Sequence, residues 1–483
     1  MQYFIGIDLG TSGVKTLLLG SDGTVLSSVT KDYPLFFPQP GWSEQNPQDW
    51  YTQTIAALKE LCATIDPQDV RAVSFSGQMH GLVLLDENNR VIRPAILWND
   101  GRSSEETEML NAQRDFLLDH TGNIAFAGFT LPKLLWVQKH EPDLFKQIRH
   151  VLLPKDYLAF RLTGSYCTDV SDASGTLYFD VAHRCWSKEI LSAFGVDERW
   201  LPRVLESDET AGMLLPELAA QLGMKDVSVV IGAGDNAAAA VGTGAVKDGD
   251  CNLSLGTSGT VFCVSDSFQL DRAHAIHSFC SASRSYHQMA CMLSAAVCSN
   301  WWVKQILNDS FASVMQKEDR LGKNDVFFLP YLMGERSPLN DTEIRGLFYG
   351  MSLQTDKDDM SLAVLEGVSF ALRHNVDLIR DMGIPVQKAT VCGGGAKDAL
   401  WLRILANVLG VTLSLPVHEE GASLGAAMLA AKGVLAADSF FALEQRVYAV
   451  ARTIEPEEGL TNLYEAKYQQ WRRLYPAIKQ AIS

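Results

Sequence analysis

The sequence lacks several features that identify common classes of protein. None of its apolar runs is long enough to cross a bilayer. Met1–Asp8 leads straight into a strand pattern, without a basic leader or an apolar stretch of secretory length. The nine cysteines include no Cys-x-x-Cys pair, so we expect reduced, mostly buried thiols rather than disulfides or zinc ligands. These absences predict a cytoplasmic location.

The chain also lacks an excess of positive charge, because its formal net charge is −16. An acidic surface repels nucleic acid and anionic lipid, so we expect neither nucleic acid nor a membrane as a partner. An anionic ligand would need a local site made of backbone amides, helix ends or a metal ion.

Length and patterning predict an α/β protein with two domains. A chain of 483 residues exceeds the size at which one hydrophobic core keeps growing. Val70–Ser76 has the pattern of a buried strand. Asn46-Pro47 is a plausible N-cap with proline at the first helical position, and it opens an amphipathic helix to about Cys62. Strands that alternate with helices in this way are typical of α/β folds.

An internal repeat divides the chain. Leu9–Gly13 and Leu255–Gly259 both read Leu-Gly-Thr-Ser-Gly, and each copy lies between two apolar strands. The same strand–turn–strand unit at the start of each half predicts two related domains, 1–245 and 246–483. No low-complexity segment separates the halves, so we expect a packed hinge between them.

The twin turns have the composition of phosphate-binding loops. Glycines let the backbone approach an anion closely, and hydroxyl groups can donate hydrogen bonds to it. Asp8 directly precedes the first turn, and one carboxylate beside a phosphate loop suits a Mg²⁺ ion held largely through water. A pair of ordinary hairpin turns is the alternative, which a single copy would favour. The candidate phosphate-binding residues are Thr11, Ser12, Gly256, Thr257 and Ser258.

A third glycine cluster lies between the strand Ala389–Cys392 and a helix that starts near Asp398. This arrangement is common where backbone without side chains lies against a nucleotide. The cluster is neither a Walker A motif nor a Gly-x-Gly-x-x-Gly fingerprint. Taken alone, it fits a nucleotide contact and a tight packing turn equally well. Its residues are Gly393, Gly394, Gly395 and Ala396.

Asp235 is the candidate general base. It follows the apolar strand Val227–Ile231 and precedes the alanine-rich segment Ala237–Ala240. Phosphoryl transfer to a hydroxyl group uses one carboxylate to accept the proton. The local sequence favours a simpler role, because aspartate directly before a helix is a favoured N-cap. The two roles are compatible.

His80 is a candidate for contact with a polar ligand. It lies with Met79 between glycines in a loop that follows a strand. An imidazole supplies both a donor and an acceptor to a polyol. A lone histidine is more often structural, so the local sequence by itself favours that interpretation.

Together these segments resemble the FGGY family of carbohydrate kinases, which is built on the actin/hexokinase-like (ribonuclease H-like) ATPase fold. Asp8–Gly13 and Leu255–Gly259 look like the two phosphate motifs, and Gly393–Ala396 looks like the adenosine-side turn. Gly128–Trp136 is similar to a family signature segment. The resemblance extends over nearly the whole chain. It implies ATP and Mg²⁺, with an active site in the cleft between a sugar-side domain (1–245) and a nucleotide-side domain (246–483).

The sugar-side segments are most similar to the branch of the family that phosphorylates xylulose. The resemblance implies that Met79 and His80 contact the sugar, that Asp235 accepts the proton and that Asn236 lies beside it. A homodimer is a further implication. One departure is Ala233, where the family pattern has a third glycine. The segments concerned are Gln78–Gly81, Trp98–Arg102, Leu153–Tyr157 and Gly234–Asn236.

Three other functions fit parts of the sequence. A kinase for ribulose, gluconate or glycerol would have the same phosphate turns. An actin-like ATPase switch would bind ATP and would need no sugar contacts. A sugar sensor without catalysis is disfavoured, because it would not need both Asp8 and Asp235.

Overall fold

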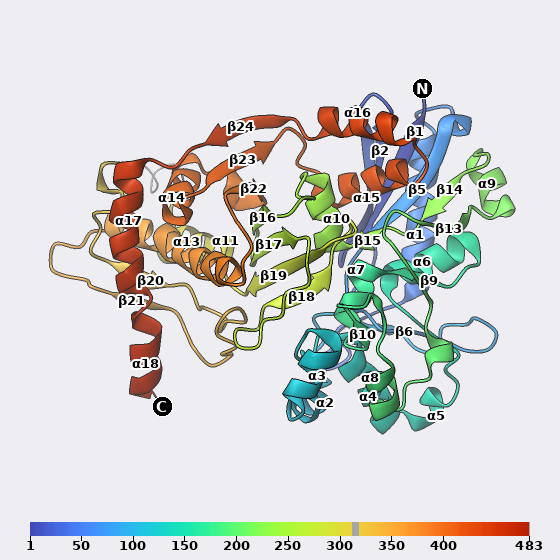
Figure 1. Ribbon diagram of the computed structural model, residues 1–483, viewed down its shortest axis with the longest axis horizontal. Coiled ribbons are helices and arrows are strands. Elements are labelled where there is room, and N and C mark those ends of the chain that lie inside the picture. Colours follow the sequence, from blue (N-terminus) through green and yellow to red (C-terminus); the bar gives the residue numbers. More distant parts are fainter. Residues whose placement is uncertain (312–317, 483) are drawn as a thin grey trace. The chain divides into compact units, whose positions relative to one another are not determined.

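The chain forms two compact units in the structure, a computed structural model that describes residues 1–311 and 318–482 (Figure 1). Unit 1 contains Met1–Val246, Ser278–Tyr286 and Glu420–Ala449. Unit 2 contains Lys247–His277, His287–Glu419 and the chain from Val450. Each unit therefore combines segments that are far apart in the sequence.

Unit 1 is built on a mixed sheet in the order β13-β14-β5-β1-β2-β3, and the short β15 also pairs with β5. β1 is antiparallel to β2 and parallel to β5, which is parallel to β14; β14 is antiparallel to β13. These strands are β1 (Tyr3–Leu9), β2 (Gly13–Gly20), β3 (Val25–Asp32), β5 (Val70–Gly77), β13 (Thr210–Met213), β14 (Ser228–Val230) and β15 (Ala233–Gly234).

Unit 2 repeats this arrangement with the order β19-β17-β16-β22-β23-β24. β16 is antiparallel to β17 and parallel to β22, which is parallel to β23; β23 is antiparallel to β24. The predicted α/β class with two related units is confirmed. The strands are β16 (Asp250–Leu255), β17 (Gly259–Ser265), β19 (Tyr286–Met292), β22 (Lys388–Cys392), β23 (Thr412–Pro416) and β24 (Val450–Ile454).

Short strands outside the two sheets form small pairs. In unit 1 these are β4 (Glu44–Gln45) with β7 (Ala95–Ile96), β6 (Val83–Leu85) with β8 (His150–Leu152), β9 (Cys167–Asp169) with β12 (Arg203–Leu205), and β10 (Phe179–Asp180) with β11 (Cys185–Trp186). In unit 2, β20 (Phe327–Leu329) pairs with β21 (Leu347–Tyr349). β18 (His277–Cys280) belongs to none of these pairs, because it is the first strand of the seven-stranded sheet that contains β16 and β17.

Helices surround the sheets. Unit 1 has α1 (Pro47–Cys62), α2 (Ser104–Asn111), α3 (Arg114–Thr121), α4 (Thr130–His140), α5 (Pro142–Phe145), α6 (Pro154–Thr163), α7 (Val170–Ala173), α8 (Lys188–Phe194), α9 (Pro216–Leu222), α10 (Asp235–Gly242), α15 (Gly421–Lys432) and α16 (Ala437–Val447). Unit 2 has α11 (Ala296–Asn300), α13 (Lys357–Asp381), α14 (Ala399–Leu409), α17 (Glu458–Trp471) and α18 (Leu474–Ile482). No helix in the described ranges is long and apolar enough to cross a membrane.

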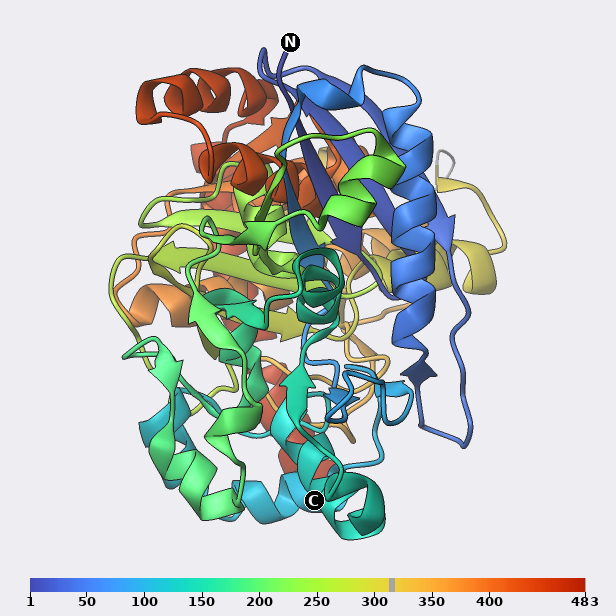
Figure 2. The same ribbon diagram turned by 90° about the vertical axis from the view of Figure 1, so that its right-hand side faces the viewer.

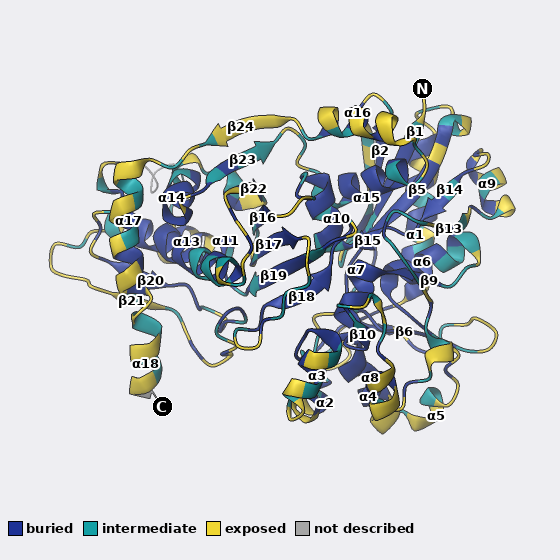
Figure 3. Ribbon diagram, viewed as in Figure 1, coloured by how far each residue is buried: buried dark blue, intermediate teal, exposed yellow. Residues whose placement is uncertain are grey.

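α1 covers one face of the unit 1 sheet (Figure 2). As predicted, Asn46 is its N-cap and accepts a hydrogen bond from the backbone N–H of Gln48. Leu58 and Leu61 of α1 belong to the same buried cluster as Ile5 and Ile7 of β1. The buried strands of both sheets carry these cores (Figure 3), and six of the nine free cysteines are buried.

α15 explains why Glu420–Ala449 belongs to unit 1, whereas the predicted division at 245/246 places it in the second half. A Cβ atom on Gly6 would lie 2.0 Å from the carbonyl oxygen of Ser423, and one on Gly425 would lie 1.7 Å from that of Ala238. α15 therefore packs backbone to backbone on β1 and α10. Gly6 alternates with Ile5 and Ile7 along β1, so α15 covers the face opposite α1.

Candidate active site

The carboxyl ends of three neighbouring strands bring the predicted unit 1 residues together. β5 lies between β1 and β15: Asp8 of β1 and Ala233 of β15 are both in register with Ser76 of β5. The three strands are parallel, so the segments that follow them leave the same edge of the sheet. These segments are the first Leu-Gly-Thr-Ser-Gly turn, the loop with Met79 and His80, and the start of α10 with Asp235.

Asp8 is a partly buried carboxylate at this edge. Ser76 Oγ donates a hydrogen bond to Asp8 Oδ1 over 2.8 Å. Burial raises the pKa of Asp8, and the Ser76 hydrogen bond and the charge of Lys15 oppose that rise. Among the residues that the structure describes, no group of three or more His, Cys, Asp or Glu side chains is arranged to hold a metal ion.

The first turn is fixed by side chains from other segments. Gln45 Nε2 donates to the carbonyl oxygen of Thr11 over 2.7 Å, and Trp98 Nε1 donates to Thr11 Oγ1 over 3.0 Å. Thr11 Oγ1 donates in turn to Gln78 Oε1 over 3.3 Å. Ser12 is exposed. The turn is therefore hydrogen-bonded to the loop that carries Met79 and His80.

Asp235 is the first residue of α10, and Gly234 occupies the N-cap position. The prediction that Asp235 caps this helix is therefore wrong, because the helix begins one residue earlier than the pattern indicates. The backbone N–H and the side-chain amide of Asn236 donate to Asp235 Oδ1 over 2.7 and 2.8 Å. Burial and the negative charge of Asp8 raise the pKa of Asp235 to about 7, against the lowering effect of Asn236.

Met79 is buried against the segment that precedes Asp235. A Cβ atom on Gly234 would lie 2.9 Å from both Cγ and Sδ of Met79, so a larger residue at this position would displace the Met79 side chain. The methyl group of Ala233, where the resemblance led us to expect glycine, is accommodated in β15 and fully buried.

His80 is held in a defined orientation. Its φ is +68°, and its Nδ1 lies 2.9 Å from the carbonyl oxygen of Gly175. A carbonyl oxygen can only accept, so Nδ1 carries the hydrogen. The ring of Phe129 packs on the imidazole with a centroid distance of 4.6 Å. Lys133 Nζ, which is buried, donates to the carbonyl oxygen of His80 over 3.0 Å.

In unit 2, the second turn and the third glycine cluster meet. Gly393 has φ +91°, and a Cβ atom there would lie 2.8 Å from the carbonyl carbon and oxygen of Leu255. Only glycine allows this approach without strain. The cluster therefore packs directly on the strand that ends in the second turn.

A cavity of about 760 Å³ opens beside these two segments, and a smaller one of about 240 Å³ adjoins it. Of the predicted nucleotide residues, Gly256, Thr257, Gly394 and Gly395 line the larger cavity; Gly393, Gly394 and Ala396 line the smaller one. Ser258 lines neither of them. A cavity of the larger volume is within the range of small-molecule sites.

The two identical pentapeptides form different loops. In the first copy Leu9 pairs with Val14, whereas in the second Leu255 pairs with Gly259, one residue nearer. The backbone N–H groups of Ala295 and Ala296 donate to the carbonyl oxygens of Thr257 and Gly256 over 3.0 and 2.8 Å. The surroundings therefore decide the loop conformation.

Sequence reasoning missed several residues around these sites. Lys397, Asp398 and Trp401 also line the larger cavity; Asp398 is the N-cap of α14, a role that its position after a glycine run could have indicated. In unit 1, Lys155 makes ion pairs with Asp169 and Asp172, and all three side chains are fully buried. No local pattern marks these pairs.

Comparison with known proteins gives consistent results. The N-terminal domain model of the FGGY family of carbohydrate kinases matches residues 3–242, and the C-terminal domain model of that family matches residues 251–434. The xylulose kinase of Escherichia coli is 43% identical over 479 residues, which cover 98% of this chain and 99% of that protein.

Solved structures agree along the whole chain. The crystal structure of a protein named "xyloylose kinase" from Brucella ovis has a TM-score of 0.95 and 42% identity, with 100% of both chains covered. A gluconate kinase from Lactobacillus acidophilus has a TM-score of 0.91 and 26% identity, with 99% of this chain and 98% of that chain covered.

Proposed function

The chain belongs to the FGGY family of carbohydrate kinases, and we propose that it transfers the γ-phosphoryl group of ATP to D-xylulose, giving D-xylulose 5-phosphate and ADP. The observation that carries this proposal is the meeting of Asp235, the Met79–His80 loop and the first phosphate turn at one edge of the unit 1 sheet. That edge combines a base, groups for a polyol and a phosphate loop.

Sequence similarity, rather than the fold, supports xylulose as the sugar. The gluconate kinase from Lactobacillus acidophilus has nearly the same fold as this chain at 26% identity. The xylulose kinase of Escherichia coli is 43% identical over almost the full length. Ribulose, gluconate and glycerol remain the alternatives.

Each unit supplies its own part of the reaction in this proposal. In unit 2, Gly393–Ala396 contacts the adenosine of ATP, and Gly256, Thr257 and Ser258 contact its phosphates. In unit 1, Thr11 and Ser12 contact the phosphates, and Met79, His80 and Asn236 contact the sugar. The lining of the larger cavity by Gly256, Thr257 and Gly394 supports the assignment of the nucleotide to unit 2.

Asp235 is the proposed general base. Its pKa of about 7 suits a group that must accept a proton at neutral pH. Asn236 donates both of its hydrogen bonds to Oδ1, so we assign the acceptance of the sugar hydroxyl proton to Oδ2. As the proton leaves, the hydroxyl oxygen attacks the γ-phosphorus of ATP. Correct alignment of these groups contributes a large part of the rate.

Mg²⁺ fits the donors at the same edge. Mg²⁺ is usually bound by one or two carboxylates together with water and substrate phosphates. Asp8 supplies such a carboxylate, which Ser76 orients by its hydrogen bond, and the hydroxyl groups of the first turn lie next to it in sequence. Bound Mg²⁺ would neutralise charge on the phosphates of ATP.

We also propose a domain boundary along the sequence at 245/246, between a sugar-side part (1–245) and a nucleotide-side part (246–483), with Ser278–Tyr286 and Glu420–Ala449 of the second part packed in unit 1. The gap between the two family-model matches, 3–242 and 251–434, supports this position. A cytoplasmic location, a homodimer, and the absence of nucleic-acid and membrane partners remain proposals. The net charge of −16 supports the last of these.

A coupled assay of ADP release over a panel of acceptors tests the proposed function. Xylulose should give the highest kcat/KM among xylulose, ribulose, gluconate and glycerol. A higher value for another acceptor would replace xylulose by that acceptor. ATP turnover that no acceptor stimulates would favour a switch ATPase, and sugar binding without ADP release would favour a sensor.

A further inference from the structure

We propose that Asp169 is a positioning residue for the base, because its carboxylate anchors both ends of the segment Gly232–Gly234 that leads into Asp235. This inference rests on the proposed function through the role of Asp235. Asp169 itself is fully buried at the end of β9. It therefore acts on the reaction only through its neighbours.

One connection runs through Ser171. Ser171 Oγ donates to Asp169 Oδ2 over 2.5 Å and accepts a hydrogen bond from the backbone N–H of Gly234 over 3.1 Å. Gly234 is the N-cap residue of α10 and directly precedes Asp235. The serine hydroxyl therefore links the buried carboxylate to the residue before the base.

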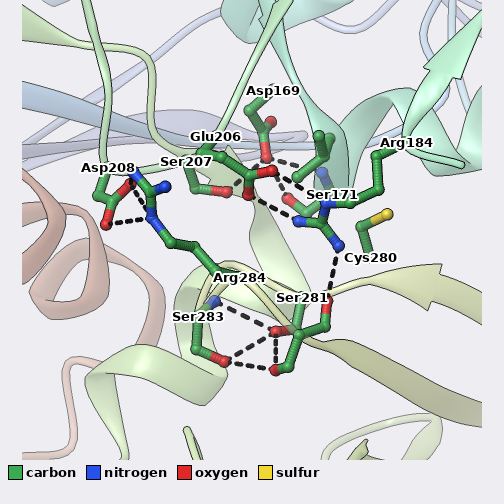
Figure 4. A network of polar contacts seen from close by, with 12 residues as sticks. Asp169, Ser171, Arg184, Glu206, Ser207, Asp208, Cys280, Ser281, Ser283 and Arg284 are labelled. Atoms are coloured by element: carbon green, nitrogen blue, oxygen red, sulfur yellow. Dashed lines mark hydrogen bonds and ion pairs between the residues drawn. The ribbon is translucent and has the colours of Figure 1, made fainter. Parts of the chain in front are cut away.

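The second connection runs through Ser207. Its Oγ donates to the same oxygen of Asp169 over 2.7 Å, and its carbonyl oxygen accepts from the backbone N–H of Gly232 over 3.1 Å. Figure 4 shows Asp169 between Ser171 and Ser207. Gly232 has φ +76°, a conformation that surrounding contacts must maintain.

Lys155 forms an ion pair with the buried carboxylate of Asp169. Its Nζ lies 2.9 Å from Asp169 Oδ1, 2.6 Å from Asp156 Oδ1 and 3.4 Å from Asp172 Oδ2. Burial lowers the pKa of Lys155, but the three carboxylates outweigh it and the pKa is raised. The lysine is therefore charged, and the charge of Asp169 is compensated without contact with water.

A simpler role for Asp169 accounts for only part of this geometry. Asp169 is also the N-cap of α7, where it accepts from the backbone N–H of Ser171 over 2.8 Å. Capping α7 needs neither the hydroxyl of Ser171 nor that of Ser207. Both hydroxyls instead connect Asp169 to the glycine segment before the base, so they are the groups to test.

Ser171→Ala is the principal variant. It removes the acceptor for the Gly234 N–H and leaves the cap of α7 in place. A shift of about 1 Å in a catalytic group can cost 10²-fold, so we expect kcat to fall about 10- to 100-fold. The KM for ATP and its Kd should stay within about twofold of the wild type. Ser171→Thr, which keeps the hydroxyl, should restore most of kcat.

Ser187→Ala is the matched control. Ser187 is a buried serine in unit 1 whose Oγ also accepts a hydrogen bond from a backbone N–H, that of Ile190, at the start of α8. This variant should retain wild-type kcat within about twofold. If Ser187→Ala and Ser171→Ala lose kcat equally, the effect is general destabilisation and the proposal is wrong.

Ser207→Ala tests the second connection. It also replaces Ser171→Ala as the test of the proposal if Ser171→Ala does not fold. It should lower kcat in the same way, with the acid limb of the pH profile unmoved because no charge is removed. A folded Ser171→Ala or Ser207→Ala enzyme with kcat within about twofold of the wild type would contradict the proposal. Asp235→Asn distinguishes failure of the proposed function from failure of this inference. If Asp235→Asn keeps normal turnover, the proposed function fails. If it loses turnover and the serine variants do not, only this inference fails.

Discussion

The negative charge of Asp8 raises the pKa of Asp235. Asp8 lies in β1, and Asp235 follows β15 on the other side of β5. Burial is the larger cause, the charge of Asp8 is the second, and together they raise the pKa of Asp235 to about 7. The candidate base therefore changes its protonation state close to neutral pH.

The rate should consequently depend on pH around neutrality. Only the ionised form of Asp235 can accept a proton, so kcat/KM, which reports the free enzyme, should rise with pH through about 7. Asp8→Asn removes the second cause of the raised pKa, so the acid limb should move to lower pH, at a reduced maximal kcat/KM. Measurement of kcat/KM for the sugar from pH 5 to 9 checks both. An acid limb that stays in place in Asp8→Asn would contradict the coupling.

Asp235→Asn should abolish turnover and leave nucleotide binding intact. General base catalysis contributes about 10²- to 10⁴-fold, so we expect a loss of kcat within or above that range. The Kd for ATP, measured by titration calorimetry, should not change. Turnover close to that of the wild type would remove Asp235 from the mechanism.

The same substitution should alter the pH dependence of stability. The folded state holds the Asp235 proton up to about pH 7, whereas the unfolded state releases it near 3.9. Between these values the folded state binds more protons, so this group makes the free energy of unfolding decrease as pH rises. Asp235→Asn has no charge to bury and should therefore be more stable than the wild type at pH 8. Urea denaturation at pH 5 and pH 8 measures the difference.

His80→Ala should impair the use of sugar and leave the use of ATP unchanged. The imidazole is oriented by Gly175 and Phe129, which suits a fixed contact to a sugar hydroxyl. We expect the KM for xylulose to rise about tenfold or more, because one hydrogen bond to the bound sugar is lost. His183→Ala, at an exposed histidine that pairs with Asp180, is the control and should change neither KM. Unchanged kinetics for xylulose in His80→Ala would make His80 a structural residue.

Gly393→Ala should weaken nucleotide binding. The added Cβ atom would lie 2.8 Å from the backbone of Leu255, so either the glycine cluster or the second turn must move. Gly383→Ala is a matched control, because Gly383 has the same φ of +91° with no atom within 4 Å of the added Cβ. Both variants carry the backbone strain, and only Gly393→Ala should raise the Kd for ATP. Equal values of Kd in the two variants would contradict the predicted role of the cluster.

Gly425→Ala should destabilise unit 1 and lower kcat as well. Its Cβ atom would lie 1.7 Å from the carbonyl oxygen of Ala238 in α10, and α10 begins with Asp235. Overpacking typically costs about 1–3 kcal/mol, occasionally more. Denaturation should show this loss, and Gly459→Ala, where the added Cβ meets no atom within 4 Å, should show no loss. Stability equal to that of the wild type in Gly425→Ala would contradict the observed close packing.

The sequence alone determined the α/β class, the two related halves and the elements around the twin turns. These depend on local patterns: apolar strands on either side of Leu9–Gly13 and Leu255–Gly259, and an N-cap with proline at Asn46-Pro47. A strand or a helix start is encoded within a few neighbouring residues, so its pattern can be recognised before any fold is known.

Only the tertiary structure decided which distant residues meet. The packing of α15 on β1, the contact of Gly393 with Leu255, and the chain from Lys155 through Asp169 and Ser171 to Gly234 all join segments that are far apart in the sequence. The two copies of Leu-Gly-Thr-Ser-Gly form different loops because different neighbours hold them. Backbone contacts and buried hydrogen bonds depend on what lies opposite in space, and no local pattern specifies that partner.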